Sequence, residues 1–265
     1  MQGLEFMAEQ NTDPEFRKAS EGTVSVLPLE EAIHKSDRDD LVRAACDPAL
    51  SADLALALLK RLDLPGEVLE QLAKNRNALK LRKVKIALAC HPRTPRHVSV
   101  PLIRQFYTFD LMKVALSPVV PSDVKLSADD TLISRLKTIT LGERLTLARQ
   151  ASGRIAGALL LDSEPRIMRT ALENSHLTEA PVVQAVLKPM ASVALVEAVA
   201  KHTKWSYRRD VQAALLRTEH LSLARALTFA RAIAPPLLRE ILQSSRLPTK
   251  IKDQLLRESE KSPRP

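Results

Sequence analysis

Ala45-Cys46-Asp47-Pro48-Ala49-Leu50-Ser51 is the first of six related seven-residue segments that recur along this chain of 265 residues. The segments begin at residues 45, 89 and 115, and again at residues 172, 216 and 242. In both groups the starts are 44 and then 26 residues apart, and the two groups are offset by 127 residues. Because recurrence at a fixed spacing is typical of repeat proteins, we predict two related halves over residues 37–125 and 164–252, with extra helices over 126–163.

Each segment, called here a turn motif, combines signals that end one helix and start the next. Proline cannot continue the helix that precedes it, and serine or threonine suits the N-cap of the helix that follows. A proline at the first helical position costs little, because its missing N–H has no partner there in any case. The predicted helix stops are Pro48, Pro92 and Pro118, the predicted N-caps are Ser51, Thr94, Thr178 and Ser222, and Pro95 is predicted at a first helical position.

The composition favours an all-α protein outside the membrane. Hydrophobic residues make up 45% of the chain and aromatic residues only 3%, and only six glycines occur. Leu, Ala, Val and Ile must therefore supply the packing, and that composition favours helices. No apolar run approaches the ~18 residues that span a bilayer. The N-terminus has no signal-peptide pattern, and two cysteines indicate no disulfide framework, so we expect a cytoplasmic protein.

The turn motifs, together with one longer stretch of sequence, resemble bacterial α-solenoids of the HEAT, armadillo and leucine-rich-repeat-variant group. The longer stretch is Leu161-Asp-Ser-Glu-Pro-Arg-Ile-Met-Arg-Thr-Ala-Leu-Glu-Asn-Ser-His-Leu-Thr-Glu179. The resemblance covers roughly residues 37–257. It implies a right-handed solenoid of stacked short helices with a long curved surface for partners. On this reading residues 28–257 form the repeat domain, residues 1–27 a disordered acidic arm and residues 258–265 a free tail.

No catalytic or metal-binding pattern stands out. The glycines are not spaced for a phosphate-binding loop, and no Gly-x-Ser-x-Gly segment occurs. Cys46, Cys90 and His91 provide too few ligands for a metal site, and the two cysteines are expected as small buried residues at helix ends. We therefore expect a protein that is not an enzyme and holds no cofactor.

Charge supplies the main functional lead. Residues 1–40 carry a net charge of −6 and the remainder +15, which gives the total of +9. A basic body attracts anionic partners. Two basic helices occupy corresponding positions of the predicted halves and could follow a phosphate backbone. The candidate polyanion-binding residues are Lys74, Arg76, Lys80, Arg82, Lys83 and Lys85 in the first helix, and Lys201, Lys204, Trp205, Arg208 and Arg209 in the second.

The aromatic residues admit two interpretations. Trp205 beside several cations could stack on bases, but a structural role is the more common reason for such a residue in a solenoid. Phe106, Tyr107 and Phe109 lie at a turn between helices, where we expect them to fill a gap in the core.

Three functions are compatible with these patterns. The leading hypothesis is a non-catalytic scaffold that binds a protein partner, acidic or extended, in a bacterial cytoplasm. The alternative is a nucleic-acid-binding solenoid that uses the paired basic helices. A remote alternative follows from resemblance to HEAT-like DNA glycosylases, which would place Trp205, Arg209 and Asp210 in a cleft around DNA. The sequence predicts no oligomeric state.

Overall fold

The computed structural model describes residues 28–34 and 37–261. The predicted acidic arm, residues 1–27, and the end of the predicted tail, residues 262–265, lie outside the described residues.

Over its described part the chain is all-α, with seventeen α-helices, one 3-10 helix and no strand. The helices are short, and most contain eight or nine residues. They are α1 Leu29–Ala32, α2 Arg38–Cys46, α3 Ala52–Leu59, α4 Gly66–Lys74, η1 Ala78–Lys80, α5 Arg82–Cys90, α6 Arg96–Ile103, α7 Thr108–Leu116, α8 Ser122–Arg135, α9 Leu141–Gln150, α10 Gly153–Leu159, α11 Pro165–Leu172, α12 Glu179–Leu187, α13 Val193–Lys201, α14 Arg209–Leu216, α15 Leu223–Arg231, α16 Pro235–Gln243 and α17 Thr249–Lys261.

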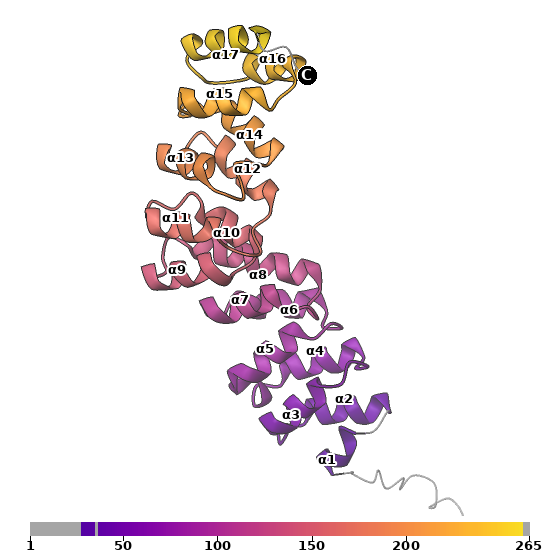
Figure 1. Ribbon diagram of the computed structural model, residues 1–265. Helices are drawn as coiled ribbons and strands as arrows, with labels where there is room; N and C mark the ends of the chain where they lie inside the picture. Colours follow the sequence, from indigo (N-terminus) through magenta and orange to yellow (C-terminus); the bar gives the residue numbers. More distant parts are fainter. Residues whose placement is uncertain (1–27, 35–36, 262–265) are drawn as a thin grey trace, which may run out of the picture.

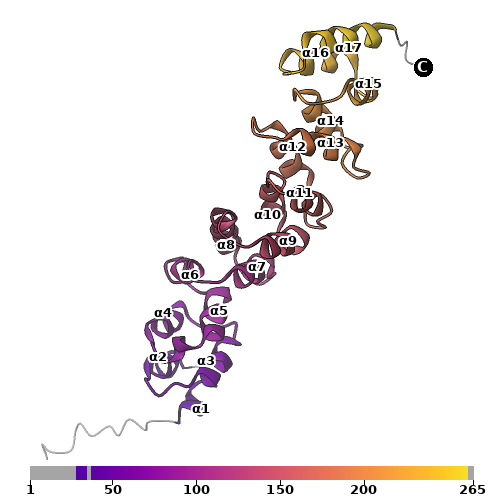
Figure 2. The same cartoon turned by 90° about the vertical axis from the view of Figure 1, so that its left-hand side faces the viewer.

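The helices form two layers in an elongated stack. From α2 onward the even-numbered helices make one column in Figure 1 and the odd-numbered helices make the other. Within the even layer α8, α10, α12, α14 and α16 pack on one another in turn, and within the odd layer α3 packs on α5, α5 on α7, and α9 on α11. Figure 2 shows the same stack turned by 90°, with α1 and α17 at opposite ends. Neighbours along the stack therefore bury each other's apolar faces, as in helical repeat proteins.

Side chains just after the helix ends join several helices to the helix two places earlier. In the even layer Asn75 Nδ2 donates to Ala45 O at 3.0 Å, 30 residues back. In the odd layer His91 Nε2 is 2.7 Å from Arg61 O, also 30 residues back. The last carbonyls of a helix have no partner within it, and the next repeat satisfies some of them here. All helices of a layer thus end at the same edge, and the structural repeat is one helix pair of about 30 residues.

The two layers run in opposite directions. Arg144 at the start of α9 contacts Asp162, just after α10, with Nη1 and Oδ2 2.7 Å apart. The starts of the odd helices therefore lie beside the ends of the even helices. We call this side of the stack the amino-terminal edge, because the odd helices begin there, and the opposite side the carboxyl-terminal edge.

The 127-residue offset relates helices of different layers. It aligns α2 with α11, α5 with α14, and α7 with α16. Each of these pairs joins one helix of the even layer with one helix of the odd layer. The 44-residue interval spans three helices, or one and a half structural repeats. The turn motif consequently marks helix ends in general and does not superpose equivalent helices. The predicted boundary between residues 125 and 126 falls inside α8, and the predicted tail from Glu258 begins inside α17.

The turn motifs end helices as predicted, but only some of their N-caps form. The residue before Pro48, Asp47, is extended at ψ 123°, because a following proline disfavours helical backbone. Ser51 is an N-cap whose side chain accepts from Leu54 N. Thr94 is not an N-cap, since its hydroxyl donates to Leu88 O at 2.6 Å, and Pro95 takes the N-cap position itself. Thr178 and Ser222 hold N-cap positions without a side-chain hydrogen bond.

The hydrophobic core is divided near α5. One cluster of buried residues runs from Ala32 to Leu88 and a second from Ala89 to Leu255. Leu102 in α6 packs against both clusters. The seam between the two clusters lies beside the starts of α5 and α7, where the candidate site described below is found.

Candidate partner-binding edge

The starts of α5, α7 and α9 form a continuous stretch of the amino-terminal edge. Arg82, the first residue of α5, forms an ion pair with Asp110 in the first turn of α7. The side chain of Thr108 contributes to the lowered pKa of Glu143, which places the starts of α7 and α9 close together. These contacts place three helix starts side by side, although together the starts span about 60 residues of the sequence.

Arg82 is the fixed centre of this stretch. Its Nε donates to Asp110 Oδ2 at 2.6 Å, and the Asp110 side chain is almost fully buried. Its guanidinium carbon lies 4.6 Å from the centre of the Tyr107 ring. A cation against a ring face gains a further attraction from the ring quadrupole. Arg82 therefore ties the two hydrophobic clusters together at the seam and holds Tyr107 in place.

Large apolar side chains are exposed along the same stretch. Tyr107 is 68% exposed and Phe109 41%, both at the start of α7. Leu81, the N-cap of α5, and Leu141, the first residue of α9, are about half exposed. Scattered single apolar residues are normal on a surface, whereas a contiguous group indicates an interaction site.

Exposed cations surround these apolar side chains. Lys80 ends η1, Lys83 follows Arg82 in α5, and Arg104 follows α6. Lys137 lies before α9, next to Arg135, whose Nη1 donates to Phe106 O at 2.7 Å. The carboxylate of Glu143 is held by the amide and hydroxyl of Thr140, and these hydrogen bonds lower its pKa. Asp110 is thus paired with Arg82 and Glu143 is held by Thr140, and exposed cations outnumber the acidic groups of this stretch.

The first predicted group of cations lies on this edge but is not one helix. Lys74 ends α4, Arg76 lies in the connection and Lys80 ends η1. The remaining three, Arg82, Lys83 and Lys85, belong to the first half of α5. Lys85 is partly buried and the other five are exposed. The prediction of a single basic helix is wrong because residues 75–81 turn from the even layer into the odd layer.

The second predicted group lies on the opposite edge, because the chain passes there from α13 to α14. Lys201 pairs with Glu197 at 3.0 Å. Lys204 Nζ lies 4.1 Å from the centre of the Trp205 ring. Arg208 is the N-cap of α14 and Arg209 its first residue, and both are exposed. The structure therefore does not bring the two predicted basic groups together.

Trp205 is a core residue and not a surface for bases. Its side chain is 1% exposed, and its Nε1 donates to Leu172 O at 3.0 Å, at the end of α11. The hydrogen bond from Trp205 to Leu172 is thus one of the bonds that join successive repeats. The stacking role, and with it the cleft expected from resemblance to DNA glycosylases, does not fit this burial.

Two other sequence expectations, for the aromatic residues at the start of α7 and for the two cysteines, have mixed outcomes. Phe106 is buried as predicted, but Tyr107 and Phe109 are exposed. The buried positions Leu111, Val114 and Ala115 set the phase of α7, and this phase places Phe109 outside the apolar stripe. Cys90 is half-buried, but Cys46 is exposed, contrary to expectation.

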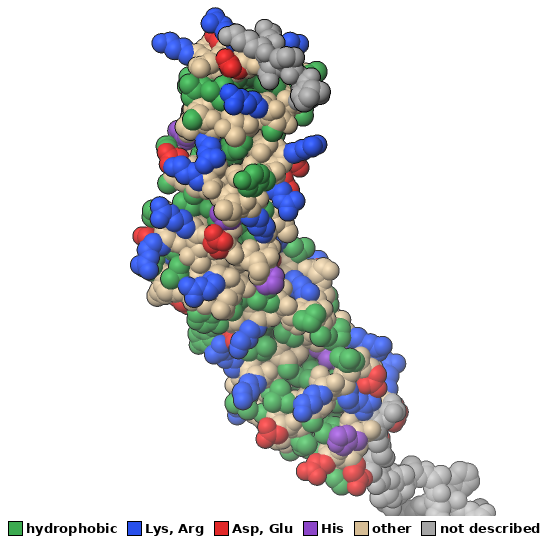
Figure 3. All heavy atoms as spheres, in the orientation of Figure 1, with side chains coloured by type: hydrophobic (Ala, Val, Ile, Leu, Met, Phe, Trp, Pro, Cys, Tyr) green, Lys and Arg blue, Asp and Glu red, His purple; other side chains and the backbone are tan. Residues whose placement is uncertain are grey.

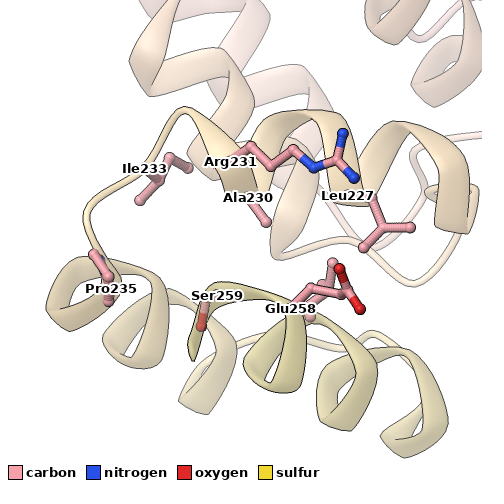
Figure 4. Close-up of a pocket in the computed structure, with 8 residues that line it drawn as sticks. Leu227, Ala230, Arg231, Ile233, Pro235, Glu258 and Ser259 are labelled. Carbon is pink, nitrogen blue, oxygen red and sulfur yellow. The ribbon is translucent and has the colours of Figure 1, made fainter. Parts of the chain in front are cut away.

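One pocket near the carboxyl-terminal end of the stack is too small for a ligand larger than water. The pocket between α15 and α17 in Figure 4 has apolar walls from Leu227, Ile233 and Pro235, with Arg231 and Glu258 at its side. Its volume of about 40 Å³ holds a few water molecules. Among the residues that the structure covers, no group of three or more His, Cys, Asp or Glu could hold a metal ion, and no helix is long and apolar enough to cross a membrane.

Comparison with protein-family models, curated proteins and solved structures gives no match to this chain. The site is therefore interpreted from its own geometry.

Proposed function

We propose that this protein is a non-catalytic helical-repeat scaffold of the cytoplasm that binds a protein partner. The binding surface is the stretch of the amino-terminal edge at the starts of α5, α7 and α9. The observation that carries the proposal is the group of exposed apolar side chains, Leu81, Tyr107, Phe109 and Leu141, set among exposed cations.

This mixture favours an acidic polypeptide that also carries apolar side chains. Cations attract an acidic partner and speed its association, but contribute modestly to affinity when they stay exposed to solvent. Apolar and aromatic side chains supply most of the binding energy at protein interfaces, with tyrosine among the commonest contributors. Aliphatic groups such as Leu81 and Leu141 have little to contact on a phosphate backbone. The partner segment is expected to be extended, because it must cross three helix starts.

We also propose kinship with the HEAT, armadillo and leucine-rich-repeat-variant solenoids, including their right-handed superhelix. The support is the arrangement of short antiparallel helices in two layers, with contacts mainly between neighbours.

The test is affinity capture at physiological salt with the full chain and three variants. One variant reverses charge at the edge, Lys80→Glu with Lys83→Glu. The second removes apolar groups there, Tyr107→Ser with Leu141→Ser. The third, a control in the even layer, is Lys125→Glu with Lys188→Glu. We expect a protein that is captured by the wild type and the control but lost with both edge variants.

The captured protein is then purified, and its affinity for each variant is measured by fluorescence anisotropy. Loss of two exposed apolar contacts at an interface centre predicts a reduction of about 10- to 30-fold. The proposal fails if the purified protein binds the edge variants and the control equally well, or if no captured protein depends on the edge.

A further inference from the structure

A row of cations follows the opposite ends of the odd-numbered helices. Each of the five consecutive odd helices α7, α9, α11, α13 and α15 has a basic residue in its last turn. All five side chains are exposed. Figure 3 shows Lys and Arg side chains along the side formed by these helices. This row, called here the carboxyl-terminal row, consists of Lys113, Arg149, Arg169, Lys201 and Arg231.

The helix dipole does not account for this row. Cations near the end of any helix are favoured by about 0.3–1 kcal/mol, so the even helices should show them equally. Of the four even helices that lie between α7 and α15, only α8 has a basic residue in its last turn, Arg135, and α10, α12 and α14 have none. The cations thus follow one layer of the stack.

The odd helices from α5 to α15 share this bias. The six odd helices from α5 to α15 carry eleven basic and three acidic residues. The six even helices from α6 to α16 carry six of each. The positive charge of the body is therefore concentrated on one of its two layers.

Most of the row is available to a ligand. Lys201 pairs with Glu197 on its own helix, and for the other four cations no ion pair is found within the described ranges. Glu173, the acid beside Arg169, is engaged by His202, with Nε2 and Oε1 3.1 Å apart. Between α11 and α13 an open groove of about 410 Å³ is lined by Arg169 and Lys201, by the paired Glu173 and His202, and by Thr170, Leu172 and Ala198.

We propose that the carboxyl-terminal row binds the phosphodiester backbone of a nucleic acid. Within the row α9 packs on α11 and α11 on α13. At the spacing of packed helices, about 8–10 Å, five successive helix ends span at least about 32–40 Å. That length exceeds a single nucleotide or lipid headgroup and suits a linear polyanion, whose phosphates follow each other every ~3.4 Å of helix axis in each strand of a duplex. This site is separate from the amino-terminal edge and does not depend on the function proposed for it.

The test measures binding of the full chain to a fluorescent oligonucleotide, single-stranded and duplex, over a range of salt concentrations. Neutralising five phosphates predicts a slope of log K against log salt of about −3 to −4 on single strands. The variant Arg149→Gln with Arg169→Gln and Arg231→Gln should make this slope less negative by about 2. The control Arg43→Gln with Lys125→Gln and Lys188→Gln removes the same charge from the even layer and should leave the slope unchanged.

Thermal melting followed by circular dichroism establishes that all variants fold. The edge variant Lys80→Glu with Lys83→Glu should keep at least half of the wild-type slope, which separates this site from the proposed protein-binding edge. The proposal is overturned if neither oligonucleotide binds, if the row variant and the control give the same slope, or if only anionic lipid vesicles or polyglutamate bind.

Discussion

The odd and even layers of this stack have the same architecture but differ in charge. In both, a buried asparagine joins one helix end to the end of the helix two places earlier, Asn75 in the even layer and Asn174 in the odd layer. Buried Leu, Val, Ile and Ala form the core of both. Only the odd layer carries an excess of basic residues. The stack is thus held by buried groups that the layers share, while the exposed groups that differ between them are free to serve partners.

Removing a buried link of the odd layer should have the largest effect. Trp205→Ala deletes a side chain that is 1% exposed and leaves Leu172 O without its donor. Such changes cost about 3–5 kcal/mol. We expect a large fall in the melting temperature, measured by circular dichroism. The matched control is Tyr207→Ala, at a side chain that is 80% exposed, which should change stability by at most about 0.5 kcal/mol. Similar melting of both variants would contradict this role of Trp205.

Removing the asparagine links compares the layers directly. Asn75 Nδ2 donates to Ala45 O and Asp47 O, and Asn174 Nδ2 donates to Ala148 O and Ala151 O. Asn75→Ala leaves Ala45 O without this donor, whereas Asp47 O still accepts from Leu50 N. Asn174→Ala removes the donor to two buried carbonyls, and we expect each substitution to cost about 1–3 kcal/mol in urea unfolding. Nearly equal losses in the free energy of unfolding would indicate that the asparagine contacts stabilise both layers in the same way. A negligible loss of stability for only one of the two variants would show that the asparagine contacts are not equivalent in the two layers.

A buried carboxylate makes the even layer sensitive to pH. Burial raises the pKa of Asp129 in α8, and the hydrogen bond from Ser152 and the charge of Arg154 only partly oppose this shift. The folded state therefore holds the proton more tightly than the unfolded state, and stability is lost as pH rises through the folded pKa. We expect Asp129→Asn to raise the melting temperature at pH 7, with the gain shrinking as pH falls below the ordinary range of aspartate. A gain independent of pH would show that the charge is not the cause.

The two cysteines should differ in their reactivity toward alkylating reagents. They occupy the same place in two turn motifs, but Cys46 ends an even helix and Cys90 an odd one. Burial raises the pKa of Cys90 to about 11, so its thiolate is scarce at pH 8. Because Cys46 is exposed, we expect iodoacetamide at pH 8 to label Cys46 first, as read by mass spectrometry of peptides. Labelling of Cys90 at the same rate would show that its burial is transient.

The helices could be predicted from sequence because their signals are local. A proline such as Pro48 forces the preceding residue into an extended conformation wherever it occurs. The candidate edge could be predicted only in part. Lys80 and Lys83 are evident as a run of cations, but their neighbours Tyr107 and Leu141 come from later helix starts. Local patterns do not determine which starts lie side by side.

The sequence by itself determined that this protein is all-α, built from short helices with prolines at several turns, and basic outside its first 40 residues. Only the tertiary structure decided the period of the repeat, which is one helix pair and not the spacing of the turn motifs. It also placed Trp205 in the core, Tyr107 on the surface, and the excess positive charge on one layer. The physical reason is that helix formation depends on neighbours within a few residues, whereas burial and charge clustering depend on contacts between groups about 30 residues apart.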